Sequence, residues 1–195
     1  MTARALPAPS RPVLSSPVLA VAIFVFTEAM LFAGLVSAYI VLRGQYAGVW
    51  PPVGQPRLPV AITGFSTAVL CASGVTMWLA VRALARGRGS LFARLLTITL
   101  VCGAAFLVMQ GREWASLIEY GMGTNANLYG SLFYTIVGAH ALHVLGAVVA
   151  LAIMSQRASR NHYTPESHDG MRALRAYWTF VVVVWPPLYG LVFLW

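Results

Sequence analysis

This sequence predicts an all-α membrane protein, a single bundle of five transmembrane helices. Three observations lead to this fold class. Of the 195 residues, 59% are hydrophobic and only 9% are charged, whereas a soluble domain has about 25% charged residues. The apolar residues gather in five long runs, each near the roughly 20 residues that a helix needs to cross a bilayer. The arginines lie mainly at the ends of these runs, which is typical of a protein with several membrane spans.

The five runs define the expected domain organisation. We expect spans at 17–42, 60–84, 91–115, 128–154 and 176–195, all within one transmembrane domain over residues 17–195. A cytoplasmic tail over residues 1–16 precedes them, and the third helix is expected to continue to about Tyr120. The first run is longer than a signal-peptide core and contains Glu28, so we expect a retained span rather than a cleaved leader. Connections rich in Gly, Pro, Asn and Arg separate the spans.

The charge distribution predicts the orientation of the bundle. All thirteen basic residues are arginine, and with five acids they give a net charge of +8. The tail, the second connection and the fourth connection hold Arg4, Arg11, Arg82, Arg86, Arg88, Arg94, Arg157, Arg160, Arg172 and Arg175, and the opposite side holds Arg43, Arg57 and Arg112. Cytoplasmic sides carry the arginine excess, which places the N-terminus in the cytoplasm and the C-terminus outside. Arginines at span ends do not form the basic face of a nucleic-acid binder.

Glu28 is the first candidate functional residue, because it lies near the middle of the first span. An ionised carboxylate at this depth costs a few kcal/mol even on lenient scales, so Glu28 must be neutral, paired, or turned toward protein or water. Two interpretations follow. Glu28 either holds two helices together as a neutral hydrogen-bonding group or carries protons through the membrane.

His140 and His143 form the second candidate site, in "VGAHALHVLGA" of the fourth span. Residues three apart share one side of a helix, so we expect both imidazoles near the depth of Glu28. A metal site needs more ligands than this pair, and Glu28 is the one other obvious donor at that depth. We therefore expect no metal, and a hydrogen bond between Glu28 and one of the two histidines.

The third polar group, in "QGREWASLIEY", contains Arg112, Glu113 and Glu119 at the outer end of the third span. Charges are tolerated at the membrane interface. These side chains are expected to form a solvated end, or an ion pair with a neighbouring subunit or a lipid headgroup. No nucleophile with its base, phosphate loop or dinucleotide fold is visible, so the residues alone indicate a helical-bundle subunit or a small transporter.

Several stretches carry a family resemblance. They are "TEAMLFAGLVSAYIVLR", "WPPVG", "SGVTMWLAVRAL", "EYGMGTNANLYGSLFYTIVGAHALHVLGA" and "YWTFVVVVWPPLYG". In this order they resemble subunit III of haem-copper oxidases, in particular cytochrome c oxidase, in the shorter five-helix bacterial form.

The resemblance implies a non-catalytic accessory subunit of the aerobic respiratory chain, located in the bacterial inner (plasma) membrane. It implies packing on the catalytic subunit I and contact with subunit II, phospholipid bound between helices, and support of proton uptake and stable turnover. Haem and copper are expected in the partner subunits and not in this chain. Glu28 matches the family's intramembrane carboxylate, and His140 and His143 match its paired histidines.

One departure concerns the last span, where the family usually has a His and an Asp. This chain has Thr179 and Val182 there, so we expect a polar network near the fifth span to be missing. The departure keeps a second interpretation open, a subunit III-like protein associated with nitric oxide reductase. An independent proton or solute carrier using Glu28, His140 and His143 is the third, although the chain lacks the internal repeats on which many transporters are built.

Overall fold

The computed structural model describes residues 15–56, 58–124, 127–159 and 169–195. Five long helices form there: α1 (Ser16–Gln45), α2 (Val60–Ala85), α3 (Gly89–Glu119), α4 (Leu128–Ser159) and α5 (Asp169–Tyr189), and the π-helical segment η1 (Gly190–Leu194) continues α5. All five are long and apolar enough to cross a membrane, and the described residues contain no strand. The predicted all-α bundle of five membrane helices is confirmed. The expectations for residues 1–14, Arg57 and Arg160 lie outside the described residues.

The helices extend beyond the apolar runs that indicated them. Helix α3 ends at Glu119, next to the predicted limit at Tyr120. Helix α5 begins at Asp169, well before the predicted span start at 176. Its first turns are polar, so hydropathy does not reveal them. The acidic Asp169 in the first turn stabilises the helix start, because its negative charge lies near the positive end of the helix dipole. Arg172 also lies 3.9 Å from Asp169, one turn away.

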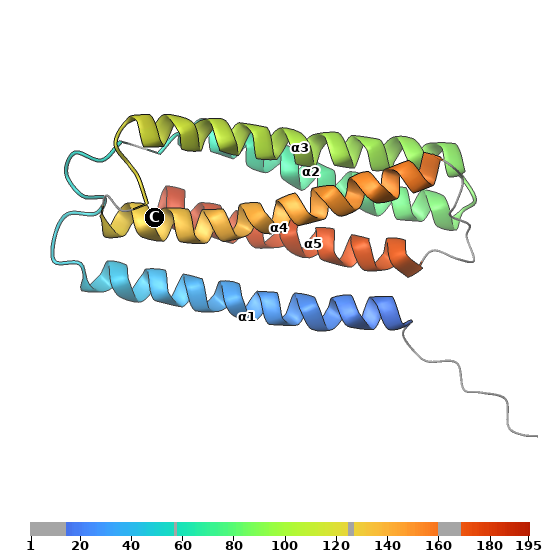
Figure 1. The fold of residues 1–195 in the computed structure, drawn as a ribbon, viewed down its shortest axis with the longest axis horizontal. Coiled ribbons are helices and arrows are strands. Elements are labelled where there is room, and N and C mark those ends of the chain that lie inside the picture. The colour runs from blue at the N-terminus through green and yellow to red at the C-terminus, as the bar shows by residue number, and fades with distance from the viewer. Residues whose placement is uncertain (1–14, 57, 125–126, 160–168) are drawn as a thin grey trace, which may run out of the picture.

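The helices lie side by side and alternate in direction (Figure 1). Helices α2 and α3 form the closest pair, joined by a tight turn in which Gly87 has φ +70°, a conformation that suits glycine. Helix α1 lies at the edge of the bundle and packs mainly on α5. Within its most apolar stretch 6% of residues are buried, against 28–39% in the other four helices. The bundle is therefore a four-helix core with α1 added at one side.

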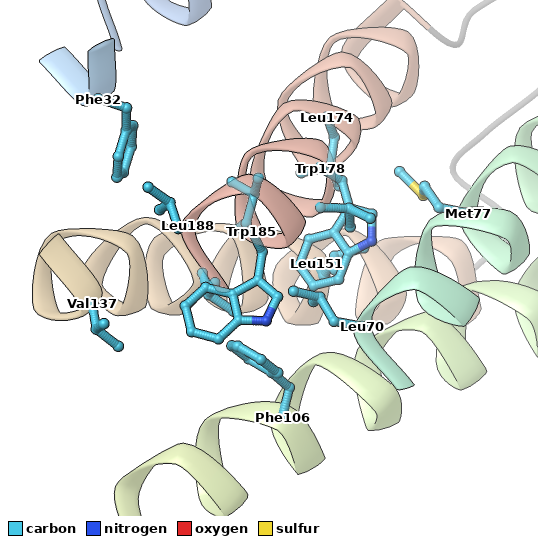
Figure 2. Close-up of a cluster of buried hydrophobic side chains, with 14 of the residues drawn as sticks. Phe32, Leu70, Met77, Phe106, Val137, Leu151, Leu174, Trp178, Trp185 and Leu188 are labelled. Atoms are coloured by element: carbon cyan, nitrogen blue, oxygen red, sulfur yellow. The ribbon is translucent and has the colours of Figure 1, made fainter. Parts of the chain in front are cut away.

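Two tryptophans of α5 form the centre of this core. Trp178 and Trp185 are fully buried and lie among side chains from α2, α3 and α4 (Figure 2). Each indole nitrogen also donates a hydrogen bond to a hydroxyl on α2, Trp178 Nε1 to Ser73 Oγ at 3.2 Å and Trp185 Nε1 to Thr67 Oγ1 at 2.8 Å. A buried indole needs such a partner, so these bonds align α5 against α2.

The alternating directions place most described arginines at one end of the bundle (Figure 1). That end, where α1 and α5 begin, holds Arg82, Arg86, Arg88, Arg94, Arg157, Arg172 and Arg175, and the other end holds Arg43 and Arg112. Arg43 stacks on Trp195, with 3.9 Å between its guanidinium carbon and the ring centroid, and donates a hydrogen bond to the Trp195 carbonyl.

Candidate functional site

Glu28 of α1 and His143 of α4 meet between their helices. The distance between His143 Nε2 and Glu28 Oε2 is 2.7 Å. His143 Nδ1 lies 2.7 Å from the carbonyl oxygen of Ala139, one turn earlier on α4. The side chains of His143 and Glu28 are 15% and 16% exposed, so the contact is largely enclosed. The pair is a polar link between the peripheral helix and the core.

The hydrogen-bond partners of His143 define how protons are arranged in this pair. A carbonyl oxygen accepts only, so the Ala139 contact requires a proton on His143 Nδ1. Nε2 then either accepts a hydrogen bond from protonated Glu28 or, as imidazolium, donates one to the carboxylate. Both arrangements are neutral overall, which avoids the cost of an unpaired charge in the membrane. Chemically, the pair can hold one proton between two atoms.

Aromatic side chains surround the pair. The ring of Phe32, which is 4% exposed, meets the His143 ring edge-on at a centroid distance of 5.2 Å. The ring centroids of Phe24 on α1 and Tyr177 on α5 are 5.7 Å apart. The Tyr177 hydroxyl donates a hydrogen bond to the His143 carbonyl at 3.3 Å. Helices α1, α4 and α5 therefore meet around Glu28 and His143 through ring contacts, with the pair as their polar part.

His140 does not join this site, although the sequence placed it on the same side of the helix. It is 1% exposed and stacks on Trp185 at a centroid distance of 4.7 Å, with Phe106 edge-on at 6.2 Å. At 3.6 residues per turn, positions three apart differ by about 60° around the helix. That rotation turns His140 into the core while His143 faces α1. Among the residues that the structure describes, no three His, Cys, Asp or Glu side chains gather in a group that could hold a metal ion.

The expectation for Glu113 at the outer end of α3 is wrong. Glu113 is 8% exposed, and its Oε2 accepts hydrogen bonds from Thr63 Oγ1 at 2.8 Å and from Gln110 Nε2 at 3.1 Å. It faces α2, because α3 remains helical to Glu119 and keeps position 113 within the bundle. Arg112 and Glu119 do lie on the exposed surface, and neither forms an ion pair with another described residue.

The polar cluster around Glu113 is the part of the molecule that sequence reasoning missed. Gln110 Nε2 also donates to Ser66 Oγ at 3.3 Å, so α2 and α3 share four buried polar side chains: Thr63, Ser66, Gln110 and Glu113. The sequence did contain a signal for this cluster, because the two polar residues on each helix are three positions apart and residues three apart are neighbours on a helix surface.

Thr179 and Val182, the two positions of α5 that depart from the family resemblance, lie in different environments. Thr179 lies on the exposed side of α5. Val182 is 8% exposed and packs on Gly74 of α2, where an added Cβ would lie 3.1 Å from Val182 Cγ1. An apolar contact therefore occupies the position at which the family resemblance implied an Asp.

Comparison with known proteins decides the family. The sequence profile of cytochrome c oxidase subunit III matches residues 10–195. The chain belongs to the cytochrome c oxidase subunit III family. The family resemblance read from the motifs is thus confirmed, and the chain is a membrane protein whose family places it in a complex with other oxidase subunits.

Individual relatives agree with this family. The chain is 35% identical over 171 residues to a probable cytochrome c oxidase subunit 3 of Nocardia farcinica, covering 88% of the chain and 84% of that protein. It is 33% identical over 175 residues to cytochrome c oxidase subunit 3 of Synechocystis sp., covering 89% and 73%. The mouse protein of the same name is 33% identical over 178 residues, covering 89% and 67%.

Proposed function

We propose that this chain is the non-catalytic accessory subunit III of a respiratory cytochrome c oxidase, acting in aerobic electron transport in a bacterial inner (plasma) membrane. The observation that carries the proposal is the family match over nearly the whole chain. The geometry of Glu28 and His143 supports it, because His143 uses one ring nitrogen on Glu28 and the other on the backbone of its own helix. Such a pair holds α1 and α4 together, and its main effect is to fix the position of α1.

The proposal includes partners and an orientation. Subunit I is the main contact and subunit II a second one, with haem and copper held by these partners and phospholipid bound between helices. Helix α1 supports this arrangement, because large apolar side chains such as Phe26 and Met30 are 66% and 62% exposed and need an apolar neighbour. The N-terminus faces the cytoplasm, in keeping with the arginine distribution.

We also place support of proton uptake and stable turnover with this subunit. Glu28 and His143 hold a proton in the membrane without net charge, a property that suits a group near a proton path. A complex depleted of this chain is expected to start turnover and then lose activity during sustained respiration, whereas the complete complex keeps its rate.

Purification of the tagged chain in a mild detergent tests the assignment. We expect a co-purifying partner that contains haem and copper and oxidises reduced cytochrome c. An unrelated tagged membrane protein from the same cells serves as the control. Recovery of the chain without any haem-bearing partner would argue strongly against the proposal.

A second candidate, a subunit III-like protein associated with nitric oxide reductase, rests on Thr179 and Val182. These positions lack the family's usual polar pair, and Val182 makes an apolar contact with Gly74 instead. The same purification separates the two candidates, because the reductase partner would reduce nitric oxide and fail to oxidise cytochrome c.

An independent proton or solute carrier is the third candidate, and the shared proton of Glu28 and His143 is the observation in its favour. The purified chain in liposomes would then move protons or solute, and Glu28→Gln would stop the movement. Liposomes that stay silent with the unmodified chain would remove this candidate.

A further inference from the structure

A second buried carboxyl group lies at the end of the bundle that contains the α1–α2 loop. Glu113 of α3 is 8% exposed and lies within two turns of the helix end at Glu119. Its Oε2 is 2.8 Å from Oγ1 of Thr63, which is fully buried in the first turn of α2. Pro59, which precedes α2, lines a cavity of about 420 Å³ together with Pro56, Ser116, Leu117 and Tyr120. The carboxyl group is therefore enclosed by protein but close to one end of the bundle.

The hydroxyl proton of Ser66 and the amide protons of Gln110 have fixed directions. The Ser66 hydroxyl lies 2.9 Å from the Thr63 carbonyl oxygen, which only accepts, so its one proton points there. Ser66 Oγ therefore accepts a hydrogen bond from Gln110 Nε2 at 3.3 Å. This bond sets the orientation of the Gln110 amide, and the second proton of Nε2 points to Glu113 Oε2 at 3.1 Å. Gln110 is thus a donor to Glu113 in either protonation state of the carboxyl group.

Thr63 has two oxygen neighbours but only one hydroxyl proton. Its Oγ1 lies 3.0 Å from the Pro59 carbonyl oxygen and 2.8 Å from Glu113 Oε2. The Pro59 carbonyl only accepts, so a Thr63 hydroxyl that donates to it can only accept from Glu113. The proton in the contact between Thr63 and Glu113 then belongs to the carboxyl group. With an ionised Glu113, Thr63 would donate to Oε2, and two oxygen atoms without a proton between them would face each other at Pro59.

The other carboxyl oxygen of Glu113 also favours the neutral acid. Oε1 is buried and receives no hydrogen bond from any described residue. A carboxylate carries its charge on both oxygens, so ionisation would place charge on a buried atom that has no donor, which is costly. A neutral acid has its proton on Oε2 and leaves Oε1 as an uncharged carbonyl oxygen, which loses less by burial.

No described charged group compensates an ionised Glu113. At this end of the bundle, the titratable side chains on the packed helices are Cys71 of α2, Arg112, Glu119 and Tyr120 of or next to α3, Tyr129 and Tyr134 of α4, and Tyr189 of α5. None of them forms a hydrogen bond or an ion pair with Glu113. The hydroxyls of Tyr134 and Tyr189 donate to backbone carbonyls instead. The polar contacts of Glu113 are therefore with neutral groups.

We propose that Glu113 is a proton-binding site, a neutral carboxylic acid at neutral pH. The bound proton joins Glu113 Oε2 to Thr63 Oγ1, and the Thr63 hydroxyl donates to the Pro59 carbonyl, so this chain of bonds connects α3, α2 and the loop before α2. When the bound proton leaves to water, the Thr63 hydroxyl turns from the Pro59 carbonyl to the carboxylate, and the loop loses this bond. The site uses residues of this chain only and depends neither on Glu28 nor on the proposed oxidase role.

Infrared spectroscopy of the complete purified complex tests the site, because a neutral carboxyl group has a C=O stretching band separate from the bands of carboxylates. The difference between the unmodified complex and Glu113→Gln at neutral pH should contain one such band. An acid loses its proton as the pH rises, so this band should disappear at alkaline pH and carboxylate bands should replace it. Glu119→Gln, at an exposed acid of the same helix, is the control and should remove only carboxylate bands at neutral pH.

Variants of Thr63 test the direction of the proton. Thr63→Val removes the hydroxyl and should move the Glu113 band to higher wavenumber, because the acid O–H loses its acceptor. Thr63→Ser keeps the hydroxyl and should leave the band in place. Thr97→Val removes an exposed hydroxyl of α3 that bonds to its own helix, and should not move the band.

Three outcomes would overturn the proposal. The first is the absence of a neutral carboxyl band for Glu113 at neutral pH, and the second is a band that Thr63→Val leaves unmoved. The third is a Glu113→Gln variant that fails to assemble while Glu119→Gln assembles, because the Gln amide can donate to Thr63 as the neutral acid does. If Thr63→Val does not assemble, the comparison with Glu113→Gln still decides, since it needs no variant of Thr63.

Discussion

At the scale of single residues, the contact between Glu28 and His143 removes the cost that either group would have alone in a membrane. The Ala139 carbonyl orients the imidazole, and the imidazole in turn provides the partner for the carboxyl group. His140, only three residues away, has a different role as a ring packed on Trp185. Neighbouring positions of one helix thus serve a polar link and an aromatic core.

Replacement of Glu28 tests the protonation of this pair. The Gln side chain in Glu28→Gln can donate from its amide to His143 Nε2, as a protonated carboxyl does, so we expect the variant to assemble nearly normally. Glu28→Leu leaves Nε2 without a partner and should lower stability by about 1–3 kcal/mol. The measurement is the amount of chain recovered in the purified complex, with His143→Leu and the double Leu variant completing the cycle.

The opposite result has a clear meaning for the same variants. If Glu28→Gln assembles as poorly as Glu28→Leu, the pair consists of imidazolium and carboxylate, because a neutral amide cannot compensate a buried positive charge. A double Leu variant whose destabilisation equals the sum of the two single effects would indicate that the two side chains do not interact energetically.

Gly103 of α3 is the second residue for which the structure predicts a measurable effect. An added Cβ would lie 2.5 Å from Cη2 of the fully buried Trp178 and 3.1 Å from Val148 Cγ2. We expect Gly103→Ala to destabilise the bundle by about 1–3 kcal/mol through overpacking. Thermal unfolding followed with a thiol-reactive dye, which would report exposure of Cys71 and Cys102, measures this. Gly146→Ala, which meets nothing within 4 Å, is the control, and an equal shift in both variants would contradict the close packing.

At the scale of helices, the boundary between α2 and α5 combines large rings with hydroxyl acceptors. Trp185 packs on His140 and Phe106 while its indole donates to Thr67. Trp185 therefore joins α5 to α3 and α4 through its ring contacts and to α2 through its hydrogen bond. Helix α1 is attached to the other four helices through Glu28, Phe32 and its contacts with α5.

The Trp185–Thr67 bond provides a test at this scale. Trp185→Phe keeps a ring in place but removes the donor, and leaves the Thr67 hydroxyl without its indole partner. We expect each of Trp185→Phe and Thr67→Val to reduce stability, with a coupling of about 0.5–1.5 kcal/mol in the double-variant cycle. The dye-monitored unfolding transition is again the measurement. Strictly additive effects would show that the bond contributes nothing to the α2–α5 contact.

At the scale of the whole molecule, the alternation of helix directions turns scattered arginines into a charge asymmetry between two ends of the bundle. The end that contains the α2–α3 turn has most of the described arginines, and the end that contains the α1–α2 loop has few (Figure 1). This asymmetry predicts the orientation in the membrane.

Cysteine labelling in intact cells tests that orientation. In a background with Cys71→Ala and Cys102→Ala, Val53→Cys in the α1–α2 loop should react with a membrane-impermeant maleimide, since Val53 is 92% exposed. Ser90→Cys, at the exposed start of α3, should react only after the cells are opened. The reverse pattern would show that the N-terminus lies outside.

Much of the fold and part of the site followed from the sequence. The apolar runs identify five membrane helices because crossing a bilayer requires length and hydrophobicity, which are local properties. Glu28 was recognised for the same reason, as an ionisable group in an apolar run. The polar first turn of α5 at Asp169 was missed, because hydropathy does not record helical segments outside the membrane.

By itself, the sequence determined the class of the molecule, its family and the residues that need partners. Only the tertiary structure decided which partners they have. His143 and not His140 meets Glu28, and Glu113 turns toward Thr63 instead of solvent, because rotation about each helix axis depends on how neighbouring helices pack. Helix packing depends on side-chain shape across the whole bundle, which no single run of residues contains.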